Sequence, residues 1–150
     1  MPLARLLAMS YRWFIDQLHQ RLAATGWDGI RPAYGFVLLV VRSGPLTPTA
    51  LAGRLGVTKQ AASKLADAMV SDGLIRRAAD GRDGRQRLLS LAPRGHELLA
   101  AVESIYVDLE AEWERVLGRA ALAGTRQALS AVMLSVNEGR YPDLRPEAVD

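Results

Sequence analysis

The sequence between positions 58 and 64 contains several residue types that make contacts with nucleic acids. These residues are Thr58, Lys59, Gln60, Ser63 and Lys64. Lysine neutralises phosphates or reaches guanine, glutamine can pair with adenine through two hydrogen bonds, and serine can contact either phosphate or base. Apolar residues at Ala62, Leu65, Ala66 and Met69 would lie on the other face of a helix. An ordinary amphipathic surface helix has the same pattern, so this segment alone leaves both alternatives open.

Two arginines form a second basic group further along the chain. Arg82 and Arg85 lie in a segment with two Asp-Gly pairs, which predict the tip of a β-hairpin. An arginine on a thin loop can enter the minor groove of DNA, where the potential is strongly negative. Asp80 and Asp83 would be wasteful in a loop that bound only phosphates, so we expect them to fix the turn and to orient the guanidinium groups. The alternative is a solvated, charged hairpin.

The residues needed for catalysis or for metal binding are scarce. There is no cysteine, and the two histidines, His19 and His96, lie far apart in the sequence. The sequence shows no arrangement of Ser, His and Asp typical of a catalytic triad, and it contains no glycine-rich phosphate-binding loop. We therefore expect no metal, no cofactor and no enzymatic activity.

The charge is distributed unevenly along the chain. Residues 44–96 contain nine Lys and Arg against four Asp, whereas residues 97–150 contain five Arg against ten acidic residues. A cationic middle joined to an acidic end suits a module that binds a polyanion, although chance clustering on a solvated face is the alternative. With 49% hydrophobic and 23% charged residues, the chain of 150 residues is expected to be one globular domain. No signal peptide or membrane span is evident, so we expect a cytoplasmic protein without membrane contact.

The basic groups are expected to lie on a helix-turn-helix followed by a hairpin. Thr47 and Pro48 predict the start of a short helix that Gly56 ends, and Thr58 caps a second helix that runs to about Ser71. Strands are expected at 74–79 and 86–91, and helices at 3–24, at 33–41, from Pro93 onward and at about 120–137. The predicted fold class is therefore mainly α with a small β-hairpin wing, a winged helix-turn-helix flanked by helices at both ends.

An ordered set of residues in this region resembles the MarR family of winged-helix regulators. The set consists of Thr47, Leu51-Ala52, Leu55-Gly56-Val57-Thr58, Ala62-Ser63-Lys64-Leu65, Asp67, Gly73-Leu74-Ile75, Asp80, Asp83-Gly84-Arg85, Leu89-Ser90-Leu91 and Gly95. The resemblance implies that 58–71 is the helix that enters the major groove, and that Arg85 is the wing arginine with Asp83 as its partner. Ala62, Val70 and Ala92 depart from the family pattern. Ala92 stands where a capping threonine is usual, so the long helix is expected to lose a cap worth about 1 kcal/mol.

The helices outside this module each have one apolar face and are expected to form a dimer. We divide the single domain of residues 1–150 into a DNA-binding lobe at 30–95, helical dimerisation regions at 1–25 and 96–138, and a flexible tail at 139–150. A two-fold homodimer, which the resemblance also implies, would bind the two half-sites of a palindromic operator. Tyr106 and Trp113 are expected in the same packing. These helices could instead complete a core within one chain.

These observations predict a sequence-specific regulator of transcription that binds double-stranded DNA, and we expect it to be a repressor. Many members of the family release DNA when a small aromatic or lipophilic ligand binds between the helical stem and the lobe. Candidate ligand-binding residues are Tyr11, Trp13, His19 and Tyr34, each of which would also suit the core or the surface. The absence of cysteine argues against the peroxide-sensing branch of the family. The alternative function is a protein-interaction module whose basic face docks an acidic partner.

Overall fold

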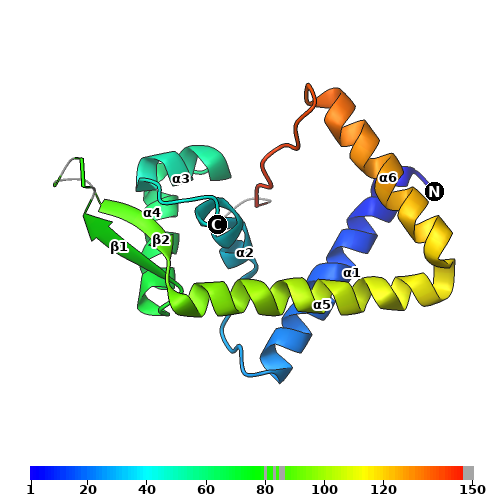
Figure 1. The fold of residues 1–150 in the computed structure, drawn as a ribbon, viewed down its shortest axis with the longest axis horizontal. Helices are drawn as coiled ribbons and strands as arrows, with labels where there is room; N and C mark the ends of the chain where they lie inside the picture. Colours follow the sequence, from blue (N-terminus) through cyan, green and yellow to red (C-terminus); the bar gives the residue numbers. More distant parts are fainter. Residues whose placement is uncertain (80, 83, 85–86, 147–150) are drawn as a thin grey trace.

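A computed structural model describes residues 1–79, 81, 82, 84 and 87–146. The predicted fold class is confirmed, since the chain forms mainly helices and one two-stranded antiparallel sheet. The elements are α1 (Leu3–Ala24), α2 (Pro32–Val41), α3 (Pro48–Leu55), α4 (Lys59–Ser71), β1 (Ile75–Ala79), β2 (Arg87–Leu91), α5 (Pro93–Leu117) and α6 (Arg119–Val136). Figure 1 shows α5 running along most of the molecule. The lobe, formed by α2, α3, α4 and the hairpin, lies at one end of it, and the stem, formed by α1, α6 and the rest of α5, lies at the other.

The ends of the short helices follow from local hydrogen bonds. The Thr47 hydroxyl accepts a hydrogen bond from the Ala50 backbone N–H at 3.1 Å, and Pro48 occupies the first helical turn of α3. Gly56 ends this helix in the left-handed conformation, with φ of 68°, which a residue without a Cβ adopts at little cost. These contacts join residues only a few positions apart, so the sequence predicts them directly.

The hydrophobic core lies inside the lobe and extends along α5. Leu51, Met69, Leu74, Leu89 and Leu98 are all fully buried and belong to one cluster. In the hairpin, Leu89 and Leu91 are buried whereas Leu88 and Ser90 are half-buried, as the alternation predicts. The register pairs Ile75 with Leu91 and Ala79 with Arg87, which places the wing tip beyond the core.

The stem leaves much of its apolar surface open. In α1, Leu18 and Leu22 are buried, but Leu3 and Leu7 remain 64% and 41% exposed. The helix α6 buries none of its residues, although Val132 and its apolar neighbours form a stripe along it. A single chain therefore satisfies only part of the apolar pattern of these helices.

Tyr106 and Trp113, which we expected in dimer packing, contact α1 of the same chain. Phe14 packs against both rings, with centroids 6.4 Å from Tyr106 and 4.8 Å from Trp113. Trp13 lies 5.8 Å from Trp113 and completes this aromatic cluster between α1 and α5. The cluster holds the two long helices of the stem together.

The segment after α6 returns from the stem towards the lobe (Figure 1). Its described part, residues 137–146, contains neither helix nor strand. Asp143 nevertheless forms an ion pair with Arg54 of α3. The flexibility expected for 139–150 stays a prediction.

No helix among the described residues combines the length and the apolar content that crossing a membrane requires.

Candidate nucleic-acid interface

The helix α4 is fixed to the lobe by its cap and by its apolar face. The Thr58 hydroxyl accepts a hydrogen bond from the Ala61 backbone N–H at 3.1 Å. Ala62, Ala66 and Met69 are 0% exposed, and Leu65 is 5% exposed. A helix whose whole apolar face is buried cannot rotate about its axis without exposing that face, so its other face is presented to solvent in one orientation.

The polar residues predicted for DNA contact lie together on the free face of this helix. Lys59, Gln60 and Lys64 are exposed, Thr58 is exposed at the cap, and Ser63 is half-buried. Lys59 and Gln60 occupy the first turn, where free backbone N–H groups and the helix dipole also attract phosphate. The structure therefore brings all five residues into one surface at the start of α4.

The wing is only partly described. Arg82 is exposed near its tip, whereas Asp83 and Arg85, two of the predicted site residues, lie outside the described residues, as does Asp80. Strand β1 also contacts α4 through an ion pair of 2.5 Å between Arg77 and Asp67. Exposed ion pairs of this kind contribute about 0–1 kcal/mol, so this pair is a minor contact between the wing and the helix.

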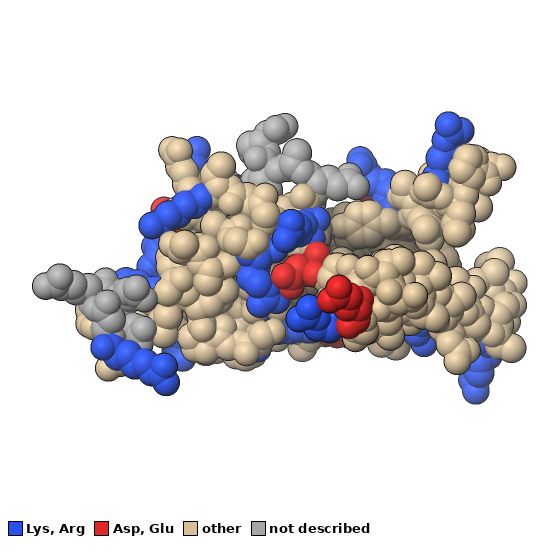
Figure 2. All heavy atoms as spheres, turned by 90° about the horizontal axis from the view of Figure 1, so that it is seen from above, with Lys and Arg blue, Asp and Glu red and all other residues tan. Residues whose placement is uncertain are grey.

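A hollow beside α4 identifies Arg87 as a further candidate residue. The hollow has a volume of about 480 Å³ and is lined by Thr47, Pro48, Thr49, Lys59 and Arg87. Two cations and two hydroxyl-bearing residues next to the start of α3 suit contact with a phosphate backbone. Arg87 continues the apolar face of Leu89 and Leu91 beyond the core, and a basic residue at the end of a buried strand face is a signal that sequence reasoning could have used. Figure 2 shows Lys and Arg side chains around the wing end of the lobe.

The four predicted ligand-binding residues do not lie together. Tyr11 and His19 line an apolar cavity of about 230 Å³ between α1, α2 and α5, together with residues such as Phe36 and Tyr106. Trp13 belongs instead to the aromatic cluster of the stem. Tyr34 is buried, is absent from the cavity lining, and donates a hydrogen bond of 2.8 Å from its hydroxyl to Asp72 at the end of α4.

Burial changes the proton affinity of groups around this cavity. Desolvation lowers the pKa of His19 below its ordinary value, against the opposing effects of a backbone hydrogen bond with Ile30 and of the Asp16 charge. Burial likewise raises the pKa of the Tyr106 hydroxyl. An apolar lining in which His19 and Tyr106 favour their neutral forms suits an aromatic or lipophilic occupant better than a small, strongly hydrated ion.

Within the described part of the chain, no group of three or more His, Asp or Glu side chains is placed to hold a metal ion.

Two short capped helices, a tight turn and a two-stranded hairpin define the chain as a winged helix-turn-helix protein, with long helices attached at both ends. A model of the MarR family matches residues 28–86. The chain belongs to the MarR family.

Known relatives agree with this assignment. The HTH-type transcriptional regulator PetP of Rhodobacter capsulatus is 38% identical over 101 residues, which are 67% of this chain and 60% of PetP. The chain thus spans somewhat less than two thirds of the length of this relative. The reduced form of MarR from E. coli has a TM-score of 0.75 and 27% identity, with 89% of this chain and 97% of that chain covered. A mutant of MepR from S. aureus is similar in fold alone, with a TM-score of 0.65 and 22% identity, covering 91% of this chain and 99% of that chain.

Proposed function

We propose that this chain is a cytoplasmic, homodimeric repressor of transcription that binds double-stranded DNA and releases it when a small aromatic or lipophilic ligand binds. The observation that carries the proposal is the helix α4, whose apolar face is buried while Lys59, Gln60 and Lys64 are exposed. In this proposal α4 enters the major groove, where Gln60 and Ser63 contact bases and the lysines contact phosphates or guanine. Arg82 and Arg85, with Asp83 as partner, act from the wing in the minor groove.

The relatives support DNA as the partner. PetP is named as an HTH-type transcriptional regulator, another solved relative is the Multiple Antibiotic Resistance Repressor, MarR, and the MepR mutant is bound to an oligodeoxyribonucleotide. In our proposal residues 30–95 form the DNA-binding lobe of a single domain, and residues 1–25 and 96–138 form the dimerisation regions. A dimer with two such lobes would bind a palindromic operator.

The open apolar surface of the stem supports the homodimer. Seven large apolar residues on α1, α5 and α6 are exposed: Leu3, Leu7, Val116, Leu129, Val132, Met133 and Val136. Apolar faces of this extent on neighbouring helices are typical of a protein–protein interface. The cavity lined by Tyr11 and His19 supports the ligand, because it is largely apolar and lies between the stem and the lobe.

A protein-interaction module that docks an acidic partner is the second candidate function. The same exposed cations, Lys59, Lys64 and Arg87, would serve it. The exposed Gln60 favours DNA, because its amide donor and acceptor together match the edge of adenine, whereas a carboxylate can use only the donor. Salt dependence and sequence preference distinguish the two.

Binding to genomic fragments tests the main proposal. We expect the protein to select a palindromic site near its own promoter, with a log–log salt slope of about 0.9 for each phosphate that it neutralises. Lys59→Gln and Lys64→Gln should each lower the slope by about one, whereas Arg115→Gln in the stem, which removes the same charge, should not. Salt-independent binding, or no enriched fragment, would contradict the proposal. Transcription from the selected promoter should rise when the protein is removed.

The wing has its own test in the same assay. Arg85→Ala should weaken binding to the selected site without changing the thermal unfolding temperature, because the residue is expected to contact DNA rather than the core. An unchanged affinity would contradict the role given to Arg85. Changing Gln60 to Ala should instead alter which sequences are selected.

A further inference from the structure

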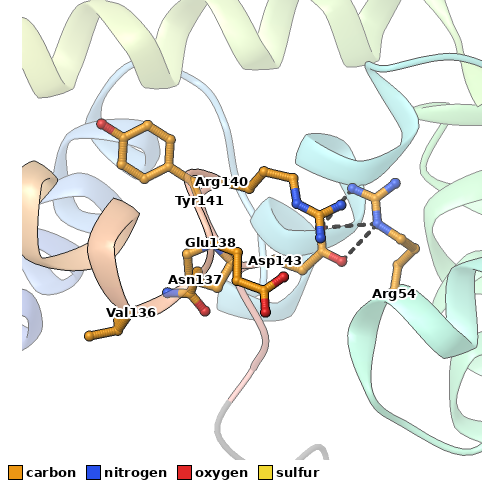
Figure 3. A pocket seen from close by; sticks show the side chains of 8 residues that line it. Arg54, Val136, Asn137, Glu138, Arg140, Tyr141 and Asp143 are labelled. Atoms are coloured by element: carbon orange, nitrogen blue, oxygen red, sulfur yellow. Dashed lines mark hydrogen bonds and ion pairs between the residues drawn. The ribbon is translucent and has the colours of Figure 1, made fainter.

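The chain that follows α6 passes close to α3, where Asp143 lies beside Arg54 (Figure 3). The Asp143 carboxylate accepts hydrogen bonds from Arg54 Nε at 3.0 Å and from Nη2 at 2.8 Å. This two-pronged geometry is the strongest arrangement of an arginine and a carboxylate. The Arg54 guanidinium correspondingly holds the pKa of Asp143 below its usual range.

A second contact of the segment lies on the turn of the helix-turn-helix. A Cβ added to Gly56 would lie 3.1 Å from Arg145 Cδ and 3.2 Å from its Nη1, so the arginine side chain lies against this glycine. Gly56 is the residue that ends α3 and leads to the Thr58 cap of α4. The positive charge of Arg145 also lies at the end of α3 that carries the negative pole of the helix dipole.

The same segment forms one wall of the apolar cavity. Leu144 and Arg145 line it, together with residues of α1, α2 and α5 that include Tyr11 and His19. This short segment therefore reaches both places: Leu144 and Arg145 line the cavity, whereas Asp143 and Arg145 contact α3 and the turn that leads to the candidate DNA-binding helix. We call residues 141–145 the strap.

The strap is the wall of the cavity that can move most easily. The volume of about 230 Å³ lies below the roughly 300–1,000 Å³ typical of small-molecule sites, so a larger occupant needs one wall to yield. The other walls include Leu22, Leu38 and Leu98, which are at most 1% exposed and belong to the core. The strap has no helix or strand, and its Leu144 is 62% exposed.

We propose that the strap is a displaceable wall that links the cavity to the helix-turn-helix: a ligand too large for the closed cavity displaces residues 141–145, breaks the Asp143–Arg54 ion pair and frees the turn at Gly56. The proposal rests on the proposed function only in assigning this release to the loss of DNA binding. The displacement itself needs no DNA and can be measured without it.

The test uses 8-anilinonaphthalene-1-sulfonate, a three-ring aromatic anion whose fluorescence rises in apolar sites. Gly35 lines the cavity, and no heavy atom lies within 4 Å of a Cβ added there, so a leucine at this position is expected to fill the cavity. The part of the probe fluorescence that Gly35→Leu removes is therefore assigned to the cavity. Asp143→Asn should lower the dissociation constant of the probe, measured from its cavity fluorescence, about two- to fivefold, which is the range that the loss of an exposed ion pair gives. Asp108→Asn, on the exposed surface of α5, makes the same change in charge and should leave the constant unchanged.

Two further measurements complete the test. Arg54→Gln should match Asp143→Asn, and the double variant should bind no more tightly than either, because both remove one interaction. In the wild type the probe should accelerate hydrogen exchange of the amides at 54–58, and Gly35→Leu should abolish this effect.

An unchanged dissociation constant in Asp143→Asn, additive effects in the double variant, or unchanged exchange at 54–58 would each overturn the proposal. Absence of any cavity signal in Asp143→Asn would also overturn it, since the opened cavity must accept the probe. A protein that shows all the expected changes but binds no DNA would support the strap and contradict the proposed function alone.

Discussion

Gly95 lies where the start of α5 approaches the backbone before β1 closely. It lies buried in the first turn of α5, where an added Cβ would be 2.1 Å from the Leu74 carbonyl oxygen and 3.2 Å from Leu91 Cδ2. The Leu74 oxygen cannot move aside easily, because it accepts a hydrogen bond of 3.0 Å from the Ala92 N–H. The absence of a side chain at position 95 therefore allows α5 to start against the base of the wing.

We expect Gly95→Ala to destabilise the protein by about 1–3 kcal/mol or more, because the new methyl group overlaps the backbone. Thermal unfolding measures the change. The matched control is Gly124→Ala in α6, where nothing lies within 4 Å of the added Cβ. That variant should be neutral or more stable by up to about 1 kcal/mol, since alanine favours helix. Equal stability of the two variants would contradict the close approach at Gly95.

The burial of His19 makes the stability of the protein depend on pH below neutrality. Its pKa is lowered from 6.5 in the folded protein, chiefly by desolvation, so the folded state favours the neutral ring. Its contribution to the free energy of unfolding is complete above about pH 6.5 and is lost as the pH falls below that value towards the lowered pKa. We expect His19→Gln to remove this part of the pH dependence in denaturant unfolding measured from about pH 7.5 to 5. His96→Gln is the control. If the free energy of unfolding of His19→Gln changes with pH as steeply as that of the wild type, His19 is not the source of this pH dependence.

At the scale of elements, α3 and α5 start from similar sequences but differ in their caps. α3 begins with Thr47-Pro48, and the threonine hydroxyl accepts a hydrogen bond from the Ala50 N–H. α5 begins with Ala92-Pro93, has the same extended backbone at the cap, with φ of −81° and ψ of 164°, and lacks a side-chain cap. The loss of a cap expected at Ala92 is thus confirmed.

Ala92→Thr should stabilise the protein by up to about 1 kcal/mol, because the new hydroxyl can share the Gly95 N–H, which already donates to the Ala92 carbonyl oxygen at 2.9 Å. Thr47→Ala should cost a similar amount. Both changes are measured by denaturant unfolding under the same conditions. A destabilised Ala92→Thr variant would mean that the half-buried site has no room for the larger side chain.

At the scale of the whole molecule, the stem presents an apolar stripe on α6 that no part of the described chain covers. Val132 and Val136 are 54% and 66% exposed, and α6 has no buried residue. A charge introduced into the stripe would be buried if a second copy packs on it.

Val132→Glu should therefore weaken the proposed homodimer about tenfold or more, which corresponds to about 1.4 kcal/mol. Sedimentation over a range of protein concentrations measures the change. Gln127→Glu adds the same charge to an exposed position of α6 and should leave the dimer intact if it lies outside the interface. A wild type that stays monomeric at all concentrations would contradict the dimer itself.

The sequence by itself determined the elements and the face of α4. The caps at Thr47 and Thr58 and the stop at Gly56 form between residues at most a few positions apart, so their residue types specify the helix ends. The period of apolar residues in α4 likewise specified which side is buried, because a helix repeats every 3.6 residues. These local rules sufficed to place Lys59, Gln60 and Lys64 on the free surface.

Only the tertiary structure decided which distant residues meet. Arg54 and Asp143 are 89 positions apart, and no periodicity predicts their ion pair. The aromatic residues at 13 and 34 resembled those at 11 and 19 in type, yet the packing of α1 against α5 and the hydrogen bond to Asp72 direct Trp13 and Tyr34 away from the cavity. Such contacts depend on how whole helices pack, which is a property of the complete core rather than of any one segment.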